Sequence, residues 1–243
     1  MIYQCYPKKT DEKSLFTTTA YEGFGLEPEV NDRLFKSCPE LESAKTRMQL
    51  TEYACFLWHW RNKENPDSWF GTTSYNQLSK FETIFKDKEE VEDLCSEHEV
   101  IGWGRYLLLD SKGHSISLKT QADTCHPGLS EFIEKVLKQF GYEVPSSWYT
   151  STIGFFANYW VMKNELFNEF MEFSWPMVKW SLNNVEDTEY FQKQHVYGTV
   201  SNAKATGYFM ERLFIIWYLM RGKEPFGLGK LHPLYHNVVG DKI

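Results

Sequence analysis

The sequence of 243 residues has no long hydrophobic run, no excess of basic residues and no paired cysteine motif. Its apolar-rich stretches reach about 13 residues, too few for a helix to span a bilayer, so no transmembrane segment is expected. The net charge of −7 argues against a broad basic surface, so no nucleic-acid partner is expected. Five scattered cysteines indicate free thiols in a reducing compartment. We therefore expect a cytoplasmic protein, with peripheral membrane association left open.

Several catalytic signatures are missing as well. No Gly-x-Gly-x-x-Gly follows a strand and no P-loop motif occurs, which disfavours the common nucleotide sites of those types. His232 and His236 lie four residues apart, but Pro233 argues against a regular helix that would bring both to one face. The chain contains no Asp-x-Asp, the motif with which many sugar transferases hold a metal and a diphosphate. No motif therefore supports a bound divalent metal, and no metal ligands are assigned.

Aromatic residues, by contrast, are abundant: Trp, Tyr and Phe make up 17% of the chain. Aromatic side chains are large and mostly apolar, so this content predicts an aromatic-rich core. The alternative is a cleft in which rings stack on nucleobases or sugars. Trp103 in IGWGR follows an expected strand and is the candidate for such a stacking platform, while a core Trp beside a turn is the alternative reading.

Apolar spacing predicts strands that alternate with helices along the chain. Strands are expected at 1–6, 68–72, 99–102 and 105–109, with a strand or strand–turn at 152–162. Helices are expected at 40–62, 78–95, 129–140, 164–173 and 207–220, the fourth ended by Pro176, and the tail beyond Pro225 is expected to be irregular. This alternation predicts a single α/β domain over residues 1–243, with a mostly parallel central sheet flanked by helices and ligands bound at the carboxyl ends of its strands.

Two segments stand out as carriers of chemistry. The sequence GTTSYNQLSK at 71–80 is dense in hydrogen-bond donors, Gly71 would let a ligand approach the backbone, and Lys80 could place a cation beside a phosphate. A polar surface turn is the alternative. Glu211 and Arg212 are charged neighbours in an apolar helix, which is costly unless they are paired or functional. Glu211 is therefore a candidate general base, and a salt bridge that anchors the helix is the alternative.

Four segments occur in a fixed order: QLTEYACFLWHWRN (49–62), DSWFGTTSYNQLSKF (67–81), GFFANYWVMKNELFNEFMEFSWPMV (154–178) and TGYFMERLFIIWYL (206–219). Together they resemble the bacterial and viral glycosyltransferase-like family associated with capsular and other surface polysaccharide synthesis. That family has an E-L-T-A-x-Y-W-x-W-K-N helix, an I-G-x-x-H-Y-R-R-Y loop, a block like N-M-F-I-M-K-K-E-L-F-x-E-Y and a late G-F-x-x-E-R-L helix. The resemblance implies a GT-A-like fold, a UDP- or GDP-sugar donor as co-substrate and a glycan acceptor.

The resemblance also implies roles for individual residues. Where the family has His-Tyr-Arg-Arg, this chain has Ser74-Tyr75-Asn76-Gln77, so two arginines are missing and Lys80 and Arg47 would replace them by position only. The match carries Asn158 and Lys163 onto the central block. The predicted donor-binding residues are Tyr3, Cys5, Tyr6, Arg47, Gly71, Thr72, Thr73, Ser74, Tyr75 and Lys80. The predicted acceptor-binding residues are Trp103, Gly154, Phe155, Asn158 and Arg212.

Glu211 is the predicted catalytic base, which would deprotonate the acceptor hydroxyl, and Asp110 and Glu52 are alternatives. The sequence is thus interpreted as a hexosyl- or pentosyltransferase that acts in the synthesis of a polysaccharide or a glycoprotein glycan. A non-catalytic glycan-binding protein on the same scaffold is the alternative, favoured by the missing arginines and the missing Asp-x-Asp.

Overall fold

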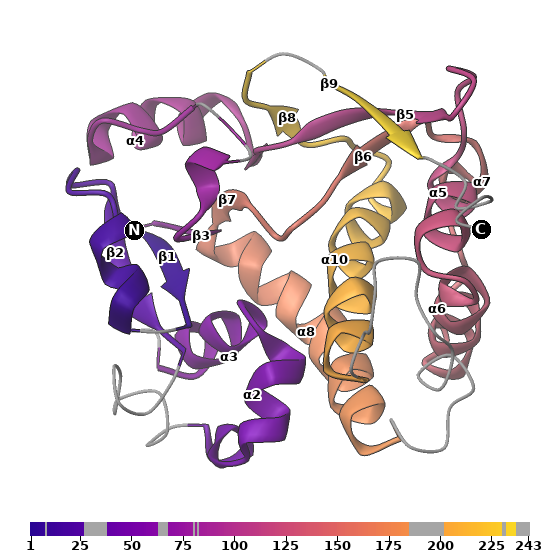
Figure 1. Ribbon diagram of the computed structural model, residues 1–243, viewed down its shortest axis with the longest axis horizontal. Helices are drawn as coiled ribbons and strands as arrows, with labels where there is room; N and C mark the ends of the chain where they lie inside the picture. Colours follow the sequence, from indigo (N-terminus) through magenta and orange to yellow (C-terminus); the bar gives the residue numbers. More distant parts are fainter. Residues whose placement is uncertain are drawn as a thin grey trace, which may run out of the picture.

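The computed structural model describes residues 1–7, 9–26, 38–62, 68–79, 81, 83–184, 202–229 and 232–236, which form two β-sheets with helices packed around them (Figure 1). The larger sheet contains β1 (Ile2–Tyr6), β2 (Tyr21–Gly25), β3 (Trp69–Ser74), β4 (Val100–Gly102), β7 (Trp160–Lys163) and β8 (Phe226–Gly227). Their order across the sheet is β2-β1-β3-β7-β4-β8. β1 is parallel to β2 and β3, and β4 is parallel to β8, whereas β7 is antiparallel to both of its neighbours. The prediction of a mostly parallel central sheet is confirmed.

The smaller sheet has the order β6-β5-β9 and was not predicted. It contains β5 (Arg105–Asp110), β6 (Ile153–Phe155) and β9 (His232–His236). β9 is parallel to β5, while β6 is antiparallel to it. The expected irregular tail beyond Pro225 is therefore wrong, because β8 and β9 each join the edge of a sheet. Pro233 is compatible with this place, since an edge strand tolerates a residue without a backbone N–H.

Helices of both the α and the 3-10 type surround the sheets (Figure 1). The 3-10 helices are η1 (Lys9–Ser14), η2 (Pro39–Glu42) and η3 (Gln77–Ser79). The α-helices are α2 (Ala44–Leu50), α3 (Tyr53–Asn62), α4 (Lys88–Glu97), α5 (Leu118–Cys125), α6 (Leu129–Gln139), α7 (Ser147–Thr150), α8 (Asn164–Asn183) and α10 (Asn202–Met220). α6 confirms the amphipathic helix predicted there, and it ends where Gly141 adopts a φ of 81°. None of the described helices is long and apolar enough to cross a membrane.

The single helix expected over 40–62 is divided into η2, α2 and α3. The break lies at Thr51, whose φ of 48° and ψ of −127° end α2. Positive φ is unfavourable for a β-branched residue, so tertiary packing must hold this break in place. The break lets α2 pack against α10 while α3 packs against α8. The apolar pattern is continuous across Thr51, and it therefore gave no sign of the change in direction.

The prediction that Pro176 ends a helix is wrong, since α8 continues to Asn183 with Pro176 inside it. A proline within a helix leaves the carbonyl of the residue four positions earlier without its usual N–H donor. That residue is Glu172, and both it and Pro176 lie on the exposed face of α8. Water can therefore solvate the freed carbonyl, while the neighbouring Phe173, Trp175 and Met177 remain buried.

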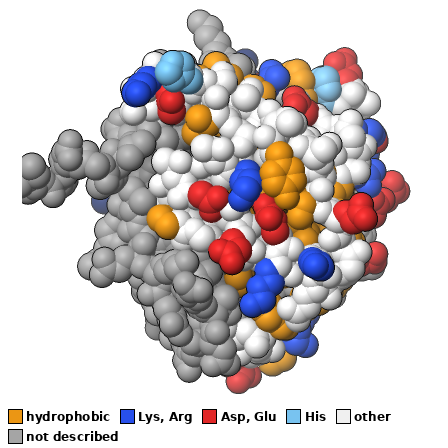
Figure 2. Space-filling model, turned by 90° about the vertical axis from the view of Figure 1, so that its right-hand side faces the viewer, with side chains coloured by type: hydrophobic (Ala, Val, Ile, Leu, Met, Phe, Trp, Pro, Cys, Tyr) orange, Lys and Arg blue, Asp and Glu red, His pale blue; other side chains and the backbone are white. Residues whose placement is uncertain are grey.

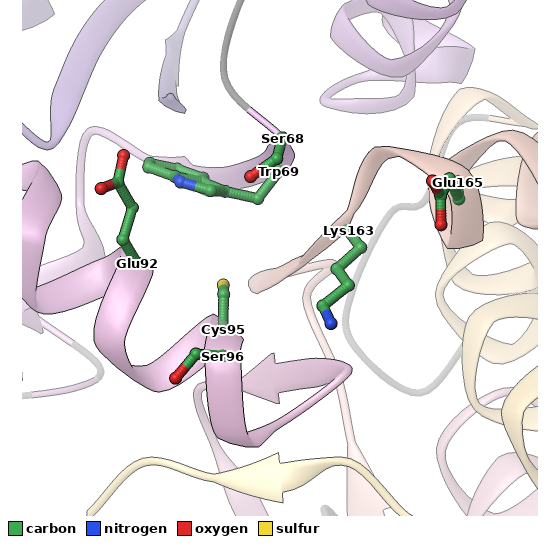
Figure 3. Close-up of a pocket in the computed structure, with 7 residues that line it drawn as sticks. All are labelled: Ser68, Trp69, Glu92, Cys95, Ser96, Lys163 and Glu165. Carbon is green, nitrogen blue, oxygen red and sulfur yellow. The ribbon is translucent and has the colours of Figure 1, made fainter.

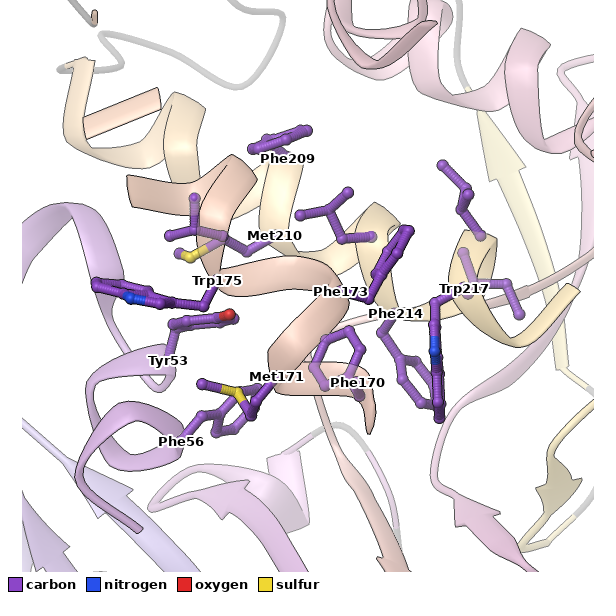
Figure 4. Close-up of a cluster of buried hydrophobic side chains, with 14 of the residues drawn as sticks. Tyr53, Phe56, Phe170, Met171, Phe173, Trp175, Phe209, Met210, Phe214 and Trp217 are labelled. Atoms are coloured by element: carbon purple, nitrogen blue, oxygen red, sulfur yellow. The ribbon is translucent and has the colours of Figure 1, made fainter. Parts of the chain in front are cut away.

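Side chains on the two faces of the six-stranded sheet pack into two separate cores. Ile2, Trp69 and Val161 point to the side covered by α4, where they join a smaller buried cluster. Tyr3 and Phe70 point to the opposite side and join the main core with α3, α8 and α10. Aromatic rings dominate the interface of these helices, where Tyr53, Phe170, Trp175, Phe214 and Trp217 are buried together (Figure 4). The aromatic-rich core predicted from composition is confirmed.

Candidate functional site

The carboxyl ends of β1 and β3 lie side by side and carry a cluster of polar side chains. The backbone N–H of Tyr75 donates to the Cys5 carbonyl over 2.9 Å, which holds the two strand ends together. Beyond this point the Ser74 hydroxyl donates to Asn76 Oδ1 and shares a hydrogen bond with the Tyr159 hydroxyl. The Tyr159 hydroxyl also lies 3.3 Å from Asn76 Oδ1. We call Ser74, Asn76 and Tyr159 the Ser74 cluster.

The charges of two carboxylates act on the Ser74 cluster. Burial, followed by the charges of Glu52 and Glu211, raises the pKa of Tyr159 well above its usual value. The charge of Glu211 also contributes, after burial, to raising the pKa of Tyr106 and Tyr208. The role of Glu211 as the base, with Glu52 as an alternative, stays a prediction.

Asp110, the other alternative base, has a local role. Its Oδ1 accepts hydrogen bonds from the backbone N–H groups of Lys112 and His114 over 2.9 and 2.8 Å. These bonds lower the pKa of Asp110. The carboxylate therefore caps the turn after β5.

Arg212 is held among protein groups, and its side chain is only 2% exposed. Its Nη2 donates to Gln121 Oε1 over 2.8 Å, and its Nη1 lies 3.3 Å from Glu211 Oε2. Its guanidinium carbon lies 4.1 Å from the centre of the Phe156 ring. Arg212 thus packs against α5 and the β6–β7 turn, whereas the Glu211 side chain is 26% exposed, and the acceptor role of Arg212 stays a prediction.

The donor-rich segment after Gly71 is mostly strand rather than loop, and its hydroxyls serve the fold. Thr72 Oγ1 donates to the Asn158 carbonyl over 2.7 Å, and Thr73 Oγ1 donates to Gln77 Oε1 over 2.5 Å. A Cβ at Gly71 would lie 2.7 Å from Val161 Cγ2, so this glycine makes room for the neighbouring strand. Pairing within the sheet buries all three residues, and their predicted donor-binding roles stay predictions.

Other predicted binding residues also lie in the interior. Tyr3 packs edge-on against Trp58, and the Trp103 indole donates to the Thr83 carbonyl over 2.9 Å. A Cβ at Gly154 would lie 2.5 Å from Phe156 Cζ, so Gly154 provides space for that ring. The predicted binding residues that are buried in this way are Tyr3, Cys5, Trp103, Gly154 and Phe155, and their binding roles stay predictions. The core interpretation of Trp103 is the one that the structure supports.

Asn158 lies in the turn between β6 and β7, where it and Ala157 have φ values of 54° and 69°. Asn158 is 4% exposed, and its Oδ1 makes no hydrogen bond. The predicted strand or strand–turn at 152–162 is thus two strands joined by a left-handed turn. This turn sets Tyr159 beside Ser74, and the acceptor role of Asn158 stays a prediction.

The remaining predicted donor residues differ in how they are placed. Tyr6 ends β1 and is 5% exposed, and burial, followed by the charge of Glu12, raises its pKa. Arg47 Nη1 donates to the carbonyls of Leu41 and Glu42, which ties η2 to α2. Tyr75 is half-buried next to Ser74. Lys80 lies outside the described residues.

Lys163 lies at the end of the strands opposite to the Ser74 cluster, since it pairs with Trp69 at the start of β3. There it borders a cavity of about 390 Å³ between α4, β3 and the start of α8 (Figure 3). Trp69, Glu92 and Cys95 form the other walls that Figure 3 shows around the cavity. Burial raises the pKa of Cys95 to about 11, so its thiol stays protonated at neutral pH. Because Trp69 and Lys163 lie at the start of β3 and Ser74 lies at its end, this cavity is separate from the Ser74 cluster.

The described residues provide no group of three His, Cys, Asp or Glu side chains that could hold a metal ion. On the face of the molecule near α5, α6 and α7, acidic and basic side chains are interspersed (Figure 2). Lys119, for example, lies 3.5 Å from both Asp123 and Glu134.

The fold is similar to that of a solved protein, the WbbM bifunctional glycosyltransferase in its apo structure. The TM-score is 0.50 and the sequence identity is 16%, over 97% of this chain and 45% of the WbbM chain. This chain therefore spans less than half of the length of WbbM. The similarity confirms the GT-A-like α/β fold expected from the sequence. No family model and no curated protein matches the chain.

The sequence did not single out Tyr159, Asn76 or Gln121 as parts of the site. Tyr159 carries a local signal, because it follows Asn158 immediately before the apolar strand β7. Asn76 lies within the donor-rich segment and stands where the resembled family has an arginine, but it was not among the predicted binding residues. Gln121 has no signal, since its partner Arg212 is 91 residues away in the chain.

Proposed function

We propose that this chain is a glycosyltransferase that moves a sugar from a UDP- or GDP-sugar to a glycan acceptor, in the synthesis of a polysaccharide or a glycoprotein glycan. The main support is the cluster of Ser74, Asn76 and Tyr159 at the carboxyl ends of β1 and β3, on which the charge of the partly exposed Glu211 acts. Ligands of α/β folds bind at the carboxyl ends of the strands. The likeness of the fold to a domain-sized part of a bifunctional glycosyltransferase adds to this support.

The arrangement suits the chemistry of sugar transfer. The sugar passes through an oxocarbenium-like state as the nucleoside diphosphate departs, and polar groups fixed beside the leaving group lower the barrier. In our proposal the half-buried Tyr75 and Asn76 contact the donor, and the buried hydroxyls of Ser74 and Tyr159 hold Asn76 in place. The Glu211 carboxylate removes the proton from the acceptor hydroxyl as that oxygen attacks the anomeric carbon, as an inverting reaction requires.

Donor binding is tested by thermal shift and calorimetric titration with a panel of UDP- and GDP-sugars, each with and without manganese. Release of UDP or GDP in the presence of glycan acceptors then measures turnover. The proposal expects at least one donor to bind and to be consumed. Absence of binding by every donor in the panel would refute it.

Replacement Glu211→Gln tests the proposed base. It is expected to reduce kcat about 100-fold or more, within the usual contribution of a positioned base, while the donor Kd changes less than about threefold. The matched control is Glu169→Gln, because Glu169 is an exposed glutamate of α8 that pairs with Arg221. The control should keep the wild-type kcat. Equal activity of Glu211→Gln and wild type would remove Glu211 from the mechanism.

The hydroxyl of Tyr159 is tested by Tyr159→Phe, which keeps the ring but removes its hydrogen bonds to Ser74 and Asn76. Loss of a typical hydrogen bond corresponds to a rise of about 3- to 10-fold in the donor Kd. An unchanged Kd would show that the Ser74 cluster does not contact the donor.

The alternative is a non-catalytic glycan-binding protein on the same scaffold. It is favoured by the internal use of Thr72, Thr73 and Arg212, which leaves fewer polar groups for a donor than the sequence suggested. Binding to a glycan array without consumption of any nucleotide sugar would support this alternative and contradict transfer.

A further inference from the structure

The surroundings of Arg212 point to a role in positioning rather than in binding. Arg212 is 2% exposed, so it cannot reach a substrate at the edge of the sheet. A buried guanidinium is costly unless its N–H groups and its charge find partners. The partners that it finds come from three different elements: α5, α10 and the turn between β6 and β7.

Each of these partners restrains a different part of the guanidinium. Gln121 of α5 is 3% exposed, and its Oε1 accepts from Nη2 over 2.8 Å. Phe156 lies against the planar face of the group, with its ring centre 4.1 Å from Cζ. Tyr106 stacks on Phe156, with ring centres 6.0 Å apart and an interplanar angle of 18°, which supports that ring from β5.

The remaining contact reaches Glu211. Neighbouring residues of a helix point in different directions, so a contact between them requires particular side-chain conformations. Glu211 Oε2 lies 3.3 Å from Arg212 Nη1 even though one side chain is partly exposed and the other is buried. A fixed guanidinium therefore restricts the Glu211 carboxylate to the conformation that makes this contact, and lowers the entropic cost of holding it there.

We propose that Arg212 is a positioning residue for Glu211, and that Gln121 and Phe156 hold Arg212 in place. This inference rests on the proposed function, in which Glu211 is the base. The residues of α5 and of the β6–β7 turn then act on the reaction through Arg212 without touching a substrate. Gln121 is the residue best suited to test this role, because it contacts the guanidinium and is remote from the Ser74 cluster in the chain.

The experiment compares Gln121→Met with Gln121→Glu. Methionine keeps the size of the side chain but removes the acceptor, whereas glutamate keeps an acceptor oxygen at the same reach. Cys125→Ala is the control, because Gln121 Nε2 also lies 3.4 Å from Cys125 Sγ and this variant leaves the contact with Arg212 intact. For each protein we would measure kcat and KM with a donor that the wild type consumes, and determine the crystal structure without ligands.

Gln121→Met is expected to lower kcat about 10- to 100-fold, the effect of a misplaced catalytic group, with KM changed less than about twofold. Its crystal structure should show that the contact between Glu211 and Arg212 is lost. Gln121→Glu should restore kcat to within about threefold of wild type, and Cys125→Ala should match wild type. If Gln121→Met does not fold, Phe156→Leu replaces it, with the same expectations.

The inference would be overturned if Gln121→Met kept the contact between Glu211 and Arg212, or lost it without a fall in kcat. If the wild type consumes no donor, the proposed function fails. The crystal structures then decide whether Gln121 fixes the conformation of Arg212 and Glu211, so the two failures remain distinguishable.

Discussion

Acidification is expected to destabilise this fold through His59 of α3. The imidazole is 5% exposed and stacks on Phe70, with ring centres 4.2 Å apart. Its Nε2 lies 3.2 Å from Asn164 Oδ1 and acts as the donor, whereas its Nδ1 makes no hydrogen bond. Protonation of Nδ1 would therefore add a buried N–H without an acceptor inside an aromatic cluster.

The size of the effect follows from the shift in pKa. Burial lowers the pKa of His59 from 6.5 to about 4. Between these values the unfolded chain binds the proton and the folded chain does not, so the free energy of unfolding falls as the pH falls through this window. Proton linkage with these two pKa values gives a loss of about 2 kcal/mol at pH 5, relative to pH values above 6.5. The loss approaches its limit of about 3 kcal/mol below pH 4.

Urea denaturation followed by tryptophan fluorescence at pH 7, 6 and 5 measures this loss. His59→Phe keeps a planar ring but cannot be protonated, so its free energy of unfolding should fall by about 2 kcal/mol less than that of wild type between pH 7 and pH 5. His98→Phe is the control, because His98 is half-buried and stacks on the exposed Phe226. It should show the wild-type pH dependence. Equal losses in wild type and His59→Phe would refute the argument.

Three further substitutions test the packing by the same denaturation measurement. Ala157→Gly should raise the free energy of unfolding by about 0.5–1 kcal/mol, because Ala157 has a φ of 69° that glycine adopts without strain; a decrease would contradict this. Gly71→Ala should lower the free energy of unfolding by about 1–3 kcal/mol, since the new Cβ would lie 2.7 Å from Val161 Cγ2. An unchanged value would show that the strands can separate. Tyr53→Phe should lower the free energy of unfolding by about 1–2 kcal/mol, because the buried Ser174 hydroxyl loses its partner at 2.7 Å. An unchanged value would contradict this expectation.

Much of the fold could be predicted from local patterns. The strands β1, β4 and β5 and the helix α6 lie where the apolar spacing placed them, and the alternation of elements predicted the mostly parallel sheet. Such patterns are local because burial of one face imposes a period of two on a strand and of 3.6 on a helix. The sequence alone likewise indicated Glu211, since a charge in an apolar helix requires a reason.

Only the tertiary structure decided which partners the polar groups find. Thr72, Ser74 and Arg212 are each satisfied inside the protein by a partner distant in the chain. Tyr159 reaches Ser74 across 85 residues, and no local pattern records such a contact. Residue type and periodicity determine which side chains can be buried, whereas their partners depend on how elements far apart in the chain pack together.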